Sequence, residues 1–305
     1  MMNIAKFLLA ITIGLSFLIP NSSAFANNSK NITEDQRKVF KETFQFSDKH
    51  INDLSDEAIK KYLSYEDPIV SKKEEYFEIT YNKHSNPKVE ELSQTEAEEK
   101  ANLLTRKEEK NAPNKVDALG SDVEKNDILK LETWLIKNKG DKEAQASARF
   151  EFLSTPDYSD FHQDILAIGT SQNLAIVKGS EDFVFKYDEF KFTREYDRYG
   201  HPIYDWVPEK EKSKRADQRD SGGYAFKFDL PDTGNRIRDM RGYMKVDVTP
   251  RSKKWRGEVY DIYSHYLHST SSVKIGFSIP LGGSFEIDKG DAIKLTGHVQ
   301  EEYDK

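Results

Sequence analysis

A stretch rich in basic residues lies between residues 236 and 256. Eight basic residues there outnumber two acidic ones, so the stretch carries a net charge of +6 in a chain whose net charge is −7. Clustered cations attract anionic surfaces such as wall polymer, lipid headgroups or nucleic acid. The alternative is that they lie on solvated loops and pair with acidic residues of adjacent strands. The candidate residues for an anionic partner are Arg236, Arg238, Arg241, Lys245, Arg251, Lys253, Lys254 and Arg256.

A second candidate site is a group of aromatic residues around the predicted turn at Gly200-His201-Pro202. Aromatic ring faces offer flat, amphipathic area on which sugars can stack. The alternative is that these rings are core residues or cross-strand pairs of a β domain. The candidate platform consists of Tyr199, Tyr204 and Trp206, with Trp255 joining them from the basic stretch.

Signatures of catalysis and metal binding are missing from the sequence. His265 and His268 are three residues apart, which places them on opposite faces of a strand, whereas chelation from a strand needs a spacing of two. There is no G-x-S-x-G motif and no phosphate-binding glycine loop. Carboxylate pairs such as Glu286 and Asp288 are too common among 53 acidic residues to indicate a glycosidase. We therefore predict no catalytic residue, no metal ligand and no cofactor.

The elements that would position these residues are β-strands. From residue 126 to 305, runs of alternating apolar and polar residues are separated by turns rich in Gly, Pro, Asp and Asn. One pair of such runs flanks the turn Asn138–Asp141, which is typical of a hairpin. No helical pattern of ten residues interrupts the series, so a parallel sheet is not expected. The pattern predicts an antiparallel β-sandwich, with a closed barrel as the alternative.

The region before residue 126 has a different character. It is polar, and its pattern predicts short helices, the first of which begins at the capping-box pattern Thr33–Gln36. At most a single strand is predicted there, near Phe77–Tyr81. We predict a helical N-terminal segment over 27–110, a linker over 111–125 without periodicity, and an all-β domain over 126–305.

The N-terminus has the pattern of a secretory signal peptide over 1–26. Phe7–Ile19 is an apolar run of 13 residues, and Ala24 and Ala26 supply the small residues expected before a cleavage site after Ala26. The chain has no cysteine, which excludes disulfides, Cys-ligated metals and lipid attachment through cysteine, and which fits bacterial export. Leu230–Gly234 (LPDTG) resembles a sortase signal but lies too far from the C-terminus, and we interpret it as a turn.

Together these features favour a secreted, non-enzymatic bacterial protein that acts as a β-sandwich binding module. The expected partners are cell-wall polymer, a glycan or another secreted protein. Export and overall acidity argue against nucleic acid, and no later apolar run is long enough for an integral membrane protein. Two alternatives stay open: an extracellular hydrolase with an unrecognised acidic site, and a membrane-active, toxin-like protein with amphipathic strands such as Val273–Leu281.

Overall fold

The computed structural model of the protein describes residues 32–82, 85–111, 125–154, 163–213, 215–231, 237–269, 276–289 and 292–303. Several features predicted from the sequence lie outside the described residues. These are the signal peptide, residues 112–124 of the linker, the last three residues of the LPDTG motif, Arg236 and the start of the run that begins at Val273.

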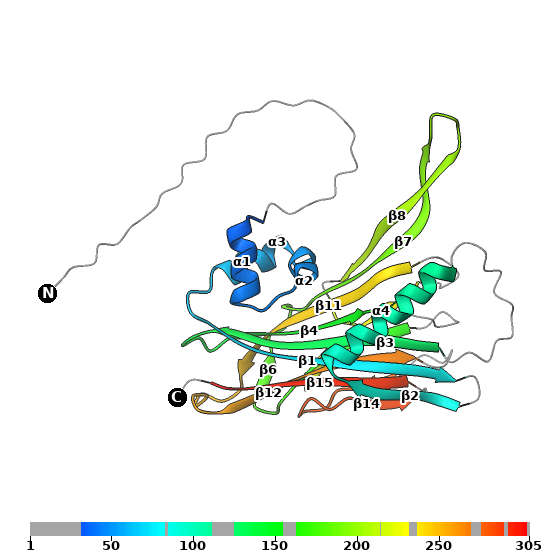
Figure 1. The fold of residues 1–305 in the computed structure, drawn as a ribbon. Coiled ribbons are helices and arrows are strands. Elements are labelled where there is room, and N and C mark those ends of the chain that lie inside the picture. Colours follow the sequence, from blue (N-terminus) through cyan, green and yellow to red (C-terminus); the bar gives the residue numbers. More distant parts are fainter. Residues whose placement is uncertain are drawn as a thin grey trace, which may run out of the picture.

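The alternating runs fold into two antiparallel sheets that pack face to face (Figure 1). The larger sheet has eight strands, and its two edges are β2 and β8. In spatial order its strands are β2 (Ser85–Leu92), β1 (Pro68–Asn82), β3 (Lys125–Asn138), β4 (Ala144–Phe152), β11 (Ile237–Pro250), β7 (Asp182–Tyr196) and β8 (Pro202–Ser213), with β6 (Leu174–Ile176) pairing with β11.

The smaller sheet has five strands, and a separate two-stranded ribbon accompanies it. Among the described residues neither sheet closes on itself, so the predicted antiparallel sandwich is confirmed and the closed barrel is not. The strands of the smaller sheet are β15 (Ala292–Glu302), β12 (Val259–Ser269), β5 (Gln163–Thr170), β10 (Gly223–Asp229) and β9 (Gln218–Asp220), and the ribbon is β13 (Gly276–Ser278) with β14 (Glu286–Lys289).

The inner faces of the two sheets form the main core. Phe150 of β4 is fully buried and lies near its centre, with its ring centroid 5.3 Å from that of Phe228 and 4.7 Å from that of Tyr266. Those two partners belong to the smaller sheet, so one ring links both layers. A hydroxyl pair, Thr133 and Ser264, also joins the sheets with its oxygens 2.5 Å apart. Side chains alternate along each strand, so the neighbours of Phe150 on β4 point to the opposite, outer face.

Three short helices pack on the outer face of the larger sheet (Figure 1). They are α1 (Glu34–Glu42), α2 (Asp48–Asp53) and α3 (Asp56–Leu63), and each begins at a Thr or Ser whose side chain accepts a hydrogen bond from the first turn. Their rings gather over Trp134 of β3; the Phe46 ring, for example, lies 5.8 Å from it. The N-terminal helices therefore dock on the β domain.

A fourth helix, α4 (Gln94–Asn111), lies on the same outer face farther along the sheet. Its buried residues Ala97 and Ala101 pack against Tyr76 of β1 and Ile128 of β3. No helix in the described part of the chain is both long and apolar enough to cross a membrane.

The region 27–110 differs from the predicted helical segment because it contributes two long strands to the larger sheet. β1 pairs with β3 from Pro68 to Tyr81, which is the full length of β3. The apolar alternation is missing from the first half of β1 because Lys72 and Glu74 occupy the outer face, where both form ion pairs with side chains of β3. This region therefore shares the core of the β domain.

Because β1 shares this core, we expect it to unfold together with the rest of the β domain. Ile79 of β1 is fully buried in the main core, whereas its cross-strand partner Val89 is 39% exposed. Ile79→Ala should lower the free energy of unfolding by about 2–4 kcal/mol in a single transition measured by urea denaturation, and the control Val89→Ala should change it much less. An unfolding transition of the β domain that Ile79→Ala leaves unshifted would contradict the shared core.

Candidate functional site

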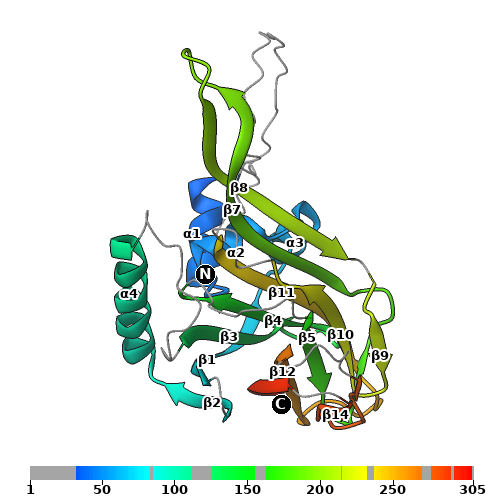
Figure 2. The ribbon, with the colours of Figure 1, turned by 90° about the vertical axis from the view of Figure 1, so that its right-hand side faces the viewer.

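The β7–β8 hairpin extends beyond the rest of the larger sheet (Figures 1 and 2). Its tip is a defined turn, because the Asp197 carboxylate accepts hydrogen bonds from the backbone amides of Tyr199 and His201 at 2.8 and 2.9 Å. Gly200 supplies the positive φ of 83° that this turn needs. The hydrogen bond from the His201 amide, with that from Tyr199, lowers the pKa of Asp197.

Five aromatic rings line one face of this hairpin. The strand register places Phe190 opposite Trp206 and Phe192 opposite Tyr204. The ring centroids of the first pair lie 5.4 Å apart and those of the second 5.9 Å, and the Tyr196 ring lies 5.4 Å from Phe192 near the tip. The Phe190 ring is also 6.2 Å from Tyr204, which joins the two pairs. We call these five residues the aromatic ladder.

The ladder is open to solvent. Tyr196 and Tyr204 are 63% and 55% exposed, and Tyr199 at the tip is 69% exposed. The opposite face of the hairpin carries charged side chains, with the Lys191 ammonium bonded to Glu189 and Glu209. A sheet face of this apolar character is normally covered by a second layer. Here the exposed tyrosines indicate that nothing in the described part of the chain covers it.

Two of the predicted site residues meet at the base of the ladder. The Arg238 guanidinium lies 4.1 Å from the centroid of the Trp206 ring, a cation–π arrangement. The same guanidinium forms an ion pair with Asp188, with 3.3 Å between Nε and Oδ2. Arg238 thus holds the ring in place and is already neutralised.

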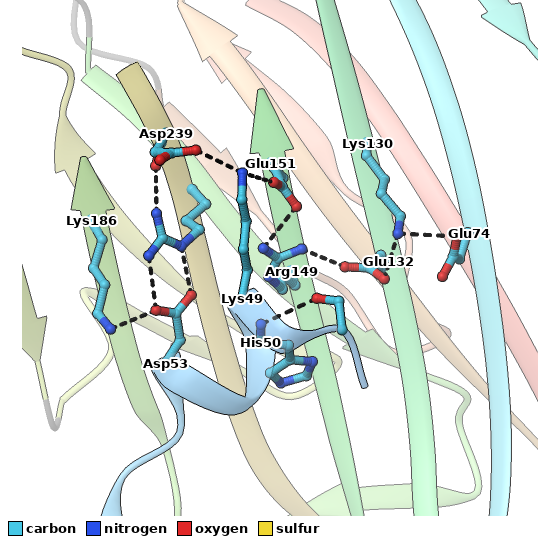
Figure 3. Close-up of polar contacts among 12 residues, drawn as sticks. Lys49, His50, Asp53, Glu74, Lys130, Glu132, Arg149, Glu151, Lys186 and Asp239 are labelled. Carbon is cyan, nitrogen blue, oxygen red and sulfur yellow. Dashed lines mark hydrogen bonds and ion pairs between the residues drawn. The ribbon is translucent and has the colours of Figure 1, made fainter. Parts of the chain in front are cut away.

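The outer face continues from the ladder into a network of buried charges beneath α2 (Figure 3). Asp53 of α2 accepts hydrogen bonds from Arg241 Nε at 2.7 Å and from Lys186 Nζ at 2.5 Å. Burial alone would raise the pKa of Asp53, but the hydrogen bonds and charges of Arg241 and Lys186 lower it to about 2. The predicted candidate Arg241 is therefore engaged inside the protein.

The centre of this network is a buried ion pair between neighbouring strands. Arg149 of β4 donates to Glu132 of β3 at 2.6 Å, and each side chain is only 1% exposed. Arg149 also pairs with Glu151 at 2.8 Å, and Lys49 of α2 bridges Glu151 to Asp239 at 2.8 and 2.6 Å. Burial opposes the ionised form of Glu132, yet the charge of Arg149 holds its pKa well below the usual range.

The other half of the basic stretch lies at the opposite end of β11. Arg251 follows the strand's last residue, which puts it roughly 40 Å from Arg238 at about 3.3 Å per residue. Arg251 donates to the carbonyl oxygens of Leu174 and Ser221, and Arg256 lies over the Trp255 ring. Lys253 and Lys254 are exposed there, and Lys245 lies midway along β11. The structure thus divides the predicted basic surface between two sites.

Trp255 is likewise separated from the rest of the predicted platform. Its ring packs edge-on against Tyr303 near the C-terminus, with 6.0 Å between centroids. Tyr204 and Trp206 lie in the ladder, and Tyr199 lies at the tip of the same hairpin. Phe190 and Phe192 could not be assigned to the platform from the sequence, because cross-strand register cannot be derived from the alternation of one strand.

The two neighbouring histidines of β12 bind different partners. His265 Nε2 is 2.8 Å from the carbonyl oxygen of Gly283, and its pKa is lowered to about 4 by burial. His268 Nδ1 is 3.0 Å from a carboxylate oxygen of Asp164, and both side chains are buried. No cluster of three metal-ligating side chains occurs within the described ranges.

Comparison with known proteins gives little further information. No protein-family model matches the chain, and no curated protein matches it. Among solved structures it is similar to the Clostridium perfringens NetB toxin in its membrane-inserted form, with 8% identity, 58% of this chain and 91% of that chain covered, and a TM-score of 0.27. Clostridium perfringens delta-toxin matches with 7% identity, coverage of 58% and 86%, and a TM-score of 0.25. At such TM-scores no argument about fold or function follows.

We expect the buried pair to be essential for stability. Glu132→Gln leaves Arg149 buried without its main counter-charge, so the free energy of unfolding should fall by about 3 kcal/mol. Glu90→Gln removes an exposed ion pair with Lys88, whose charged atoms are 3.6 Å apart, and should change it by less than about 1 kcal/mol. Urea denaturation compares the two variants, and equal effects would contradict the role assigned to Glu132.

Proposed function

We propose that this protein is a binding module that attaches to the surface of a lipid bilayer through the aromatic ladder of its β7–β8 hairpin. The observation that carries this proposal is the exposure of Tyr196, Tyr199 and Tyr204 on an element that extends beyond the sandwich. Tyrosine and tryptophan combine an apolar ring with a polar edge, which suits them to the boundary between headgroups and acyl chains.

The side chains around the ladder favour a bilayer over a glycan. A sugar that stacks on a ring also needs hydrogen-bonding groups for its hydroxyls. On the ladder's face of the hairpin, the charged neighbours at its base, Asp188 and Arg238, are already bonded to each other. Next along β8 comes Pro208, which lies opposite Asp188. At its base this face therefore offers a partner rings, and its charged groups there are already paired.

The charge of the tip indicates how the attachment is driven. Residues 194–205 contain Arg194 and Arg198 against Glu195, Asp197 and Asp205, which gives a net charge of −1. Attraction to anionic headgroups therefore contributes little, and burial of the rings supplies the free energy. We expect binding to neutral lipid that salt weakens only slightly, because screening acts on charges.

The predicted signal peptide supports the same proposal. A run of the length of Phe7–Ile19, followed by small residues at Ala24 and Ala26, directs a chain to export. We propose that the mature protein is secreted and meets the bilayer from outside the cell that makes it.

We expect the tyrosines to control lipid binding. Replacing both Tyr196 and Tyr204 by Ala removes two half-exposed rings, each of which contributes about 1 kcal/mol when buried at the interface. Affinity for phosphatidylcholine vesicles, measured by sedimentation, should fall about 10- to 30-fold. The matched control is Val207→Ala, which alters the opposite face of β8 and should bind as the unmodified protein does.

Two results would overturn this proposal. One is a double variant that binds vesicles as tightly as the unmodified protein. The other is that the unmodified protein does not bind vesicles but binds a polysaccharide through the same tyrosines, which would make the ladder a glycan site.

A further inference from the structure

We propose that the N-terminal segment of residues 32–65 is an acid-released cover over the outer face of the larger sheet. The segment holds α1, α2 and α3. Besides hydrogen bonds of the Tyr62 hydroxyl with Gln145 and Tyr243, it has two larger groups of contacts with the sheet. One is an aromatic cluster over Trp134, and the other is the network of buried charges beneath α2 (Figure 3).

The charged part makes this interface unlike an ordinary core. Lys49 and Asp53 of α2 are held by Glu151, Lys186 and Arg241 of the sheet at 2.5–2.8 Å. Desolvating paired charges costs nearly as much as the pairing returns. When the segment leaves, water can solvate the same groups again. The charged contacts therefore fix the position of the segment while adding little net resistance to its release.

His50 makes the release sensitive to acid. Its ring is fully buried between Phe46, Trp134 and Tyr243, with centroid distances of 4.1, 4.8 and 4.9 Å. Neither ring nitrogen is hydrogen-bonded to any residue that the structure describes. A protonated imidazole at this position would have two N–H donors without acceptors and a charge without water.

The charges that face His50 have opposing effects. Arg149 of β4 and Lys72 of β1 disfavour its protonation, while Glu132 of β3 and Asp53 of α2 favour it. Burial is the largest effect, and with Arg149 it lowers the pKa of His50 to about 3, against 6.5 for an exposed histidine.

The sign of the pH effect follows from these values. Between pH 6.5 and 3 the released segment binds a proton at His50 that the docked segment does not. The docked state therefore loses stability as the pH falls through this range. The pKa of Asp53 is lowered to about 2, so loss of its ion pairs adds to the release only at pH values below about 4.

Release would enlarge the face that carries the aromatic ladder. Lys186, which binds the segment, and Asp188, at the base of the ladder, lie two residues apart on β7, so their side chains share one face. Without the segment, Trp134 and Tyr243 would become accessible on that face. The release itself does not depend on lipid, so it can be tested in the absence of vesicles.

A single cysteine in a chain that has none can report the release. Ser147 of β4 is fully buried on the outer face and lies opposite Trp134 in the strand register. In the full chain with Ser147→Cys, the reaction rate with a pyridyl disulfide reagent, corrected for the reactivity of an exposed thiol, should rise about 25-fold from pH 7 to pH 5. Adding His50→Phe, which keeps a ring but cannot titrate, should reduce this rise to less than about twofold.

Ser264→Cys is the matched control, because Ser264 is equally buried but lies between the two sheets. Its reaction should not accelerate, since the sandwich stays folded. Hydrogen exchange of the unmodified chain gives a second measurement. Once the slower intrinsic exchange at low pH is corrected for, the protection factors of the α1–α3 amides should fall by the same factor from pH 7 to pH 5, and those of β5 should not fall. Three results would each overturn the proposal. They are a corrected reaction rate at Ser147→Cys that does not change with pH, equal acceleration at both cysteines, and a rise that persists with His50→Phe.

Discussion

Glu132 and Arg149 form an ion pair at positions where a sheet normally presents either apolar or solvated side chains. They lie opposite each other on adjacent strands and point away from the main core, and each is only 1% exposed. Charges that a covering element removes from water must be paired and hydrogen-bonded inside the protein. The larger sheet therefore needs a cover with charges of its own, and α2 supplies Lys49 and Asp53.

The two faces of the larger sheet consequently have different energetics. The inner face is apolar and meets the smaller sheet through residues such as Phe150 and Met244, whose burial follows the hydrophobic effect. The outer face is divided along β7 and β8 into a part that the helices cover and a part, the aromatic ladder, that is open. The outer face of the sandwich is thus open to solvent at one end and covered by the N-terminal helices at the other.

Much of the fold could be predicted from the sequence. In a two-layer sandwich each strand has one face in the core, so apolar and polar residues alternate along it. This alternation is absent from the first half of β1, because Lys72 and Glu74 lie there on a charged outer face. The helix starts could be predicted because Thr33 is a local capping signal. That α2 docks on the charged face of the sheet depends on contacts between residues 102 to 190 positions apart, which no local pattern encodes.

The candidate sites were less predictable for the same reason. The sequence indicates both Trp206 and Arg238 as candidates, but their contact results from the pairing of β7 with both β8 and β11. Trp255 is near Arg238 in sequence, yet the extended length of β11 separates them. Charge counts likewise cannot distinguish Arg241, which is paired with Asp53, from the exposed Lys253.

The most direct test of the account is hydrogen exchange of the full, unmodified chain with and without phosphatidylcholine vesicles at neutral pH. If the aromatic ladder is the binding surface, lipid should slow exchange in β7 and β8 between residues 186 and 208 and leave the loop over 251–258 unchanged. Slower exchange at that loop with no change in the hairpin, or no protection anywhere, would contradict the proposal that the aromatic ladder binds lipid.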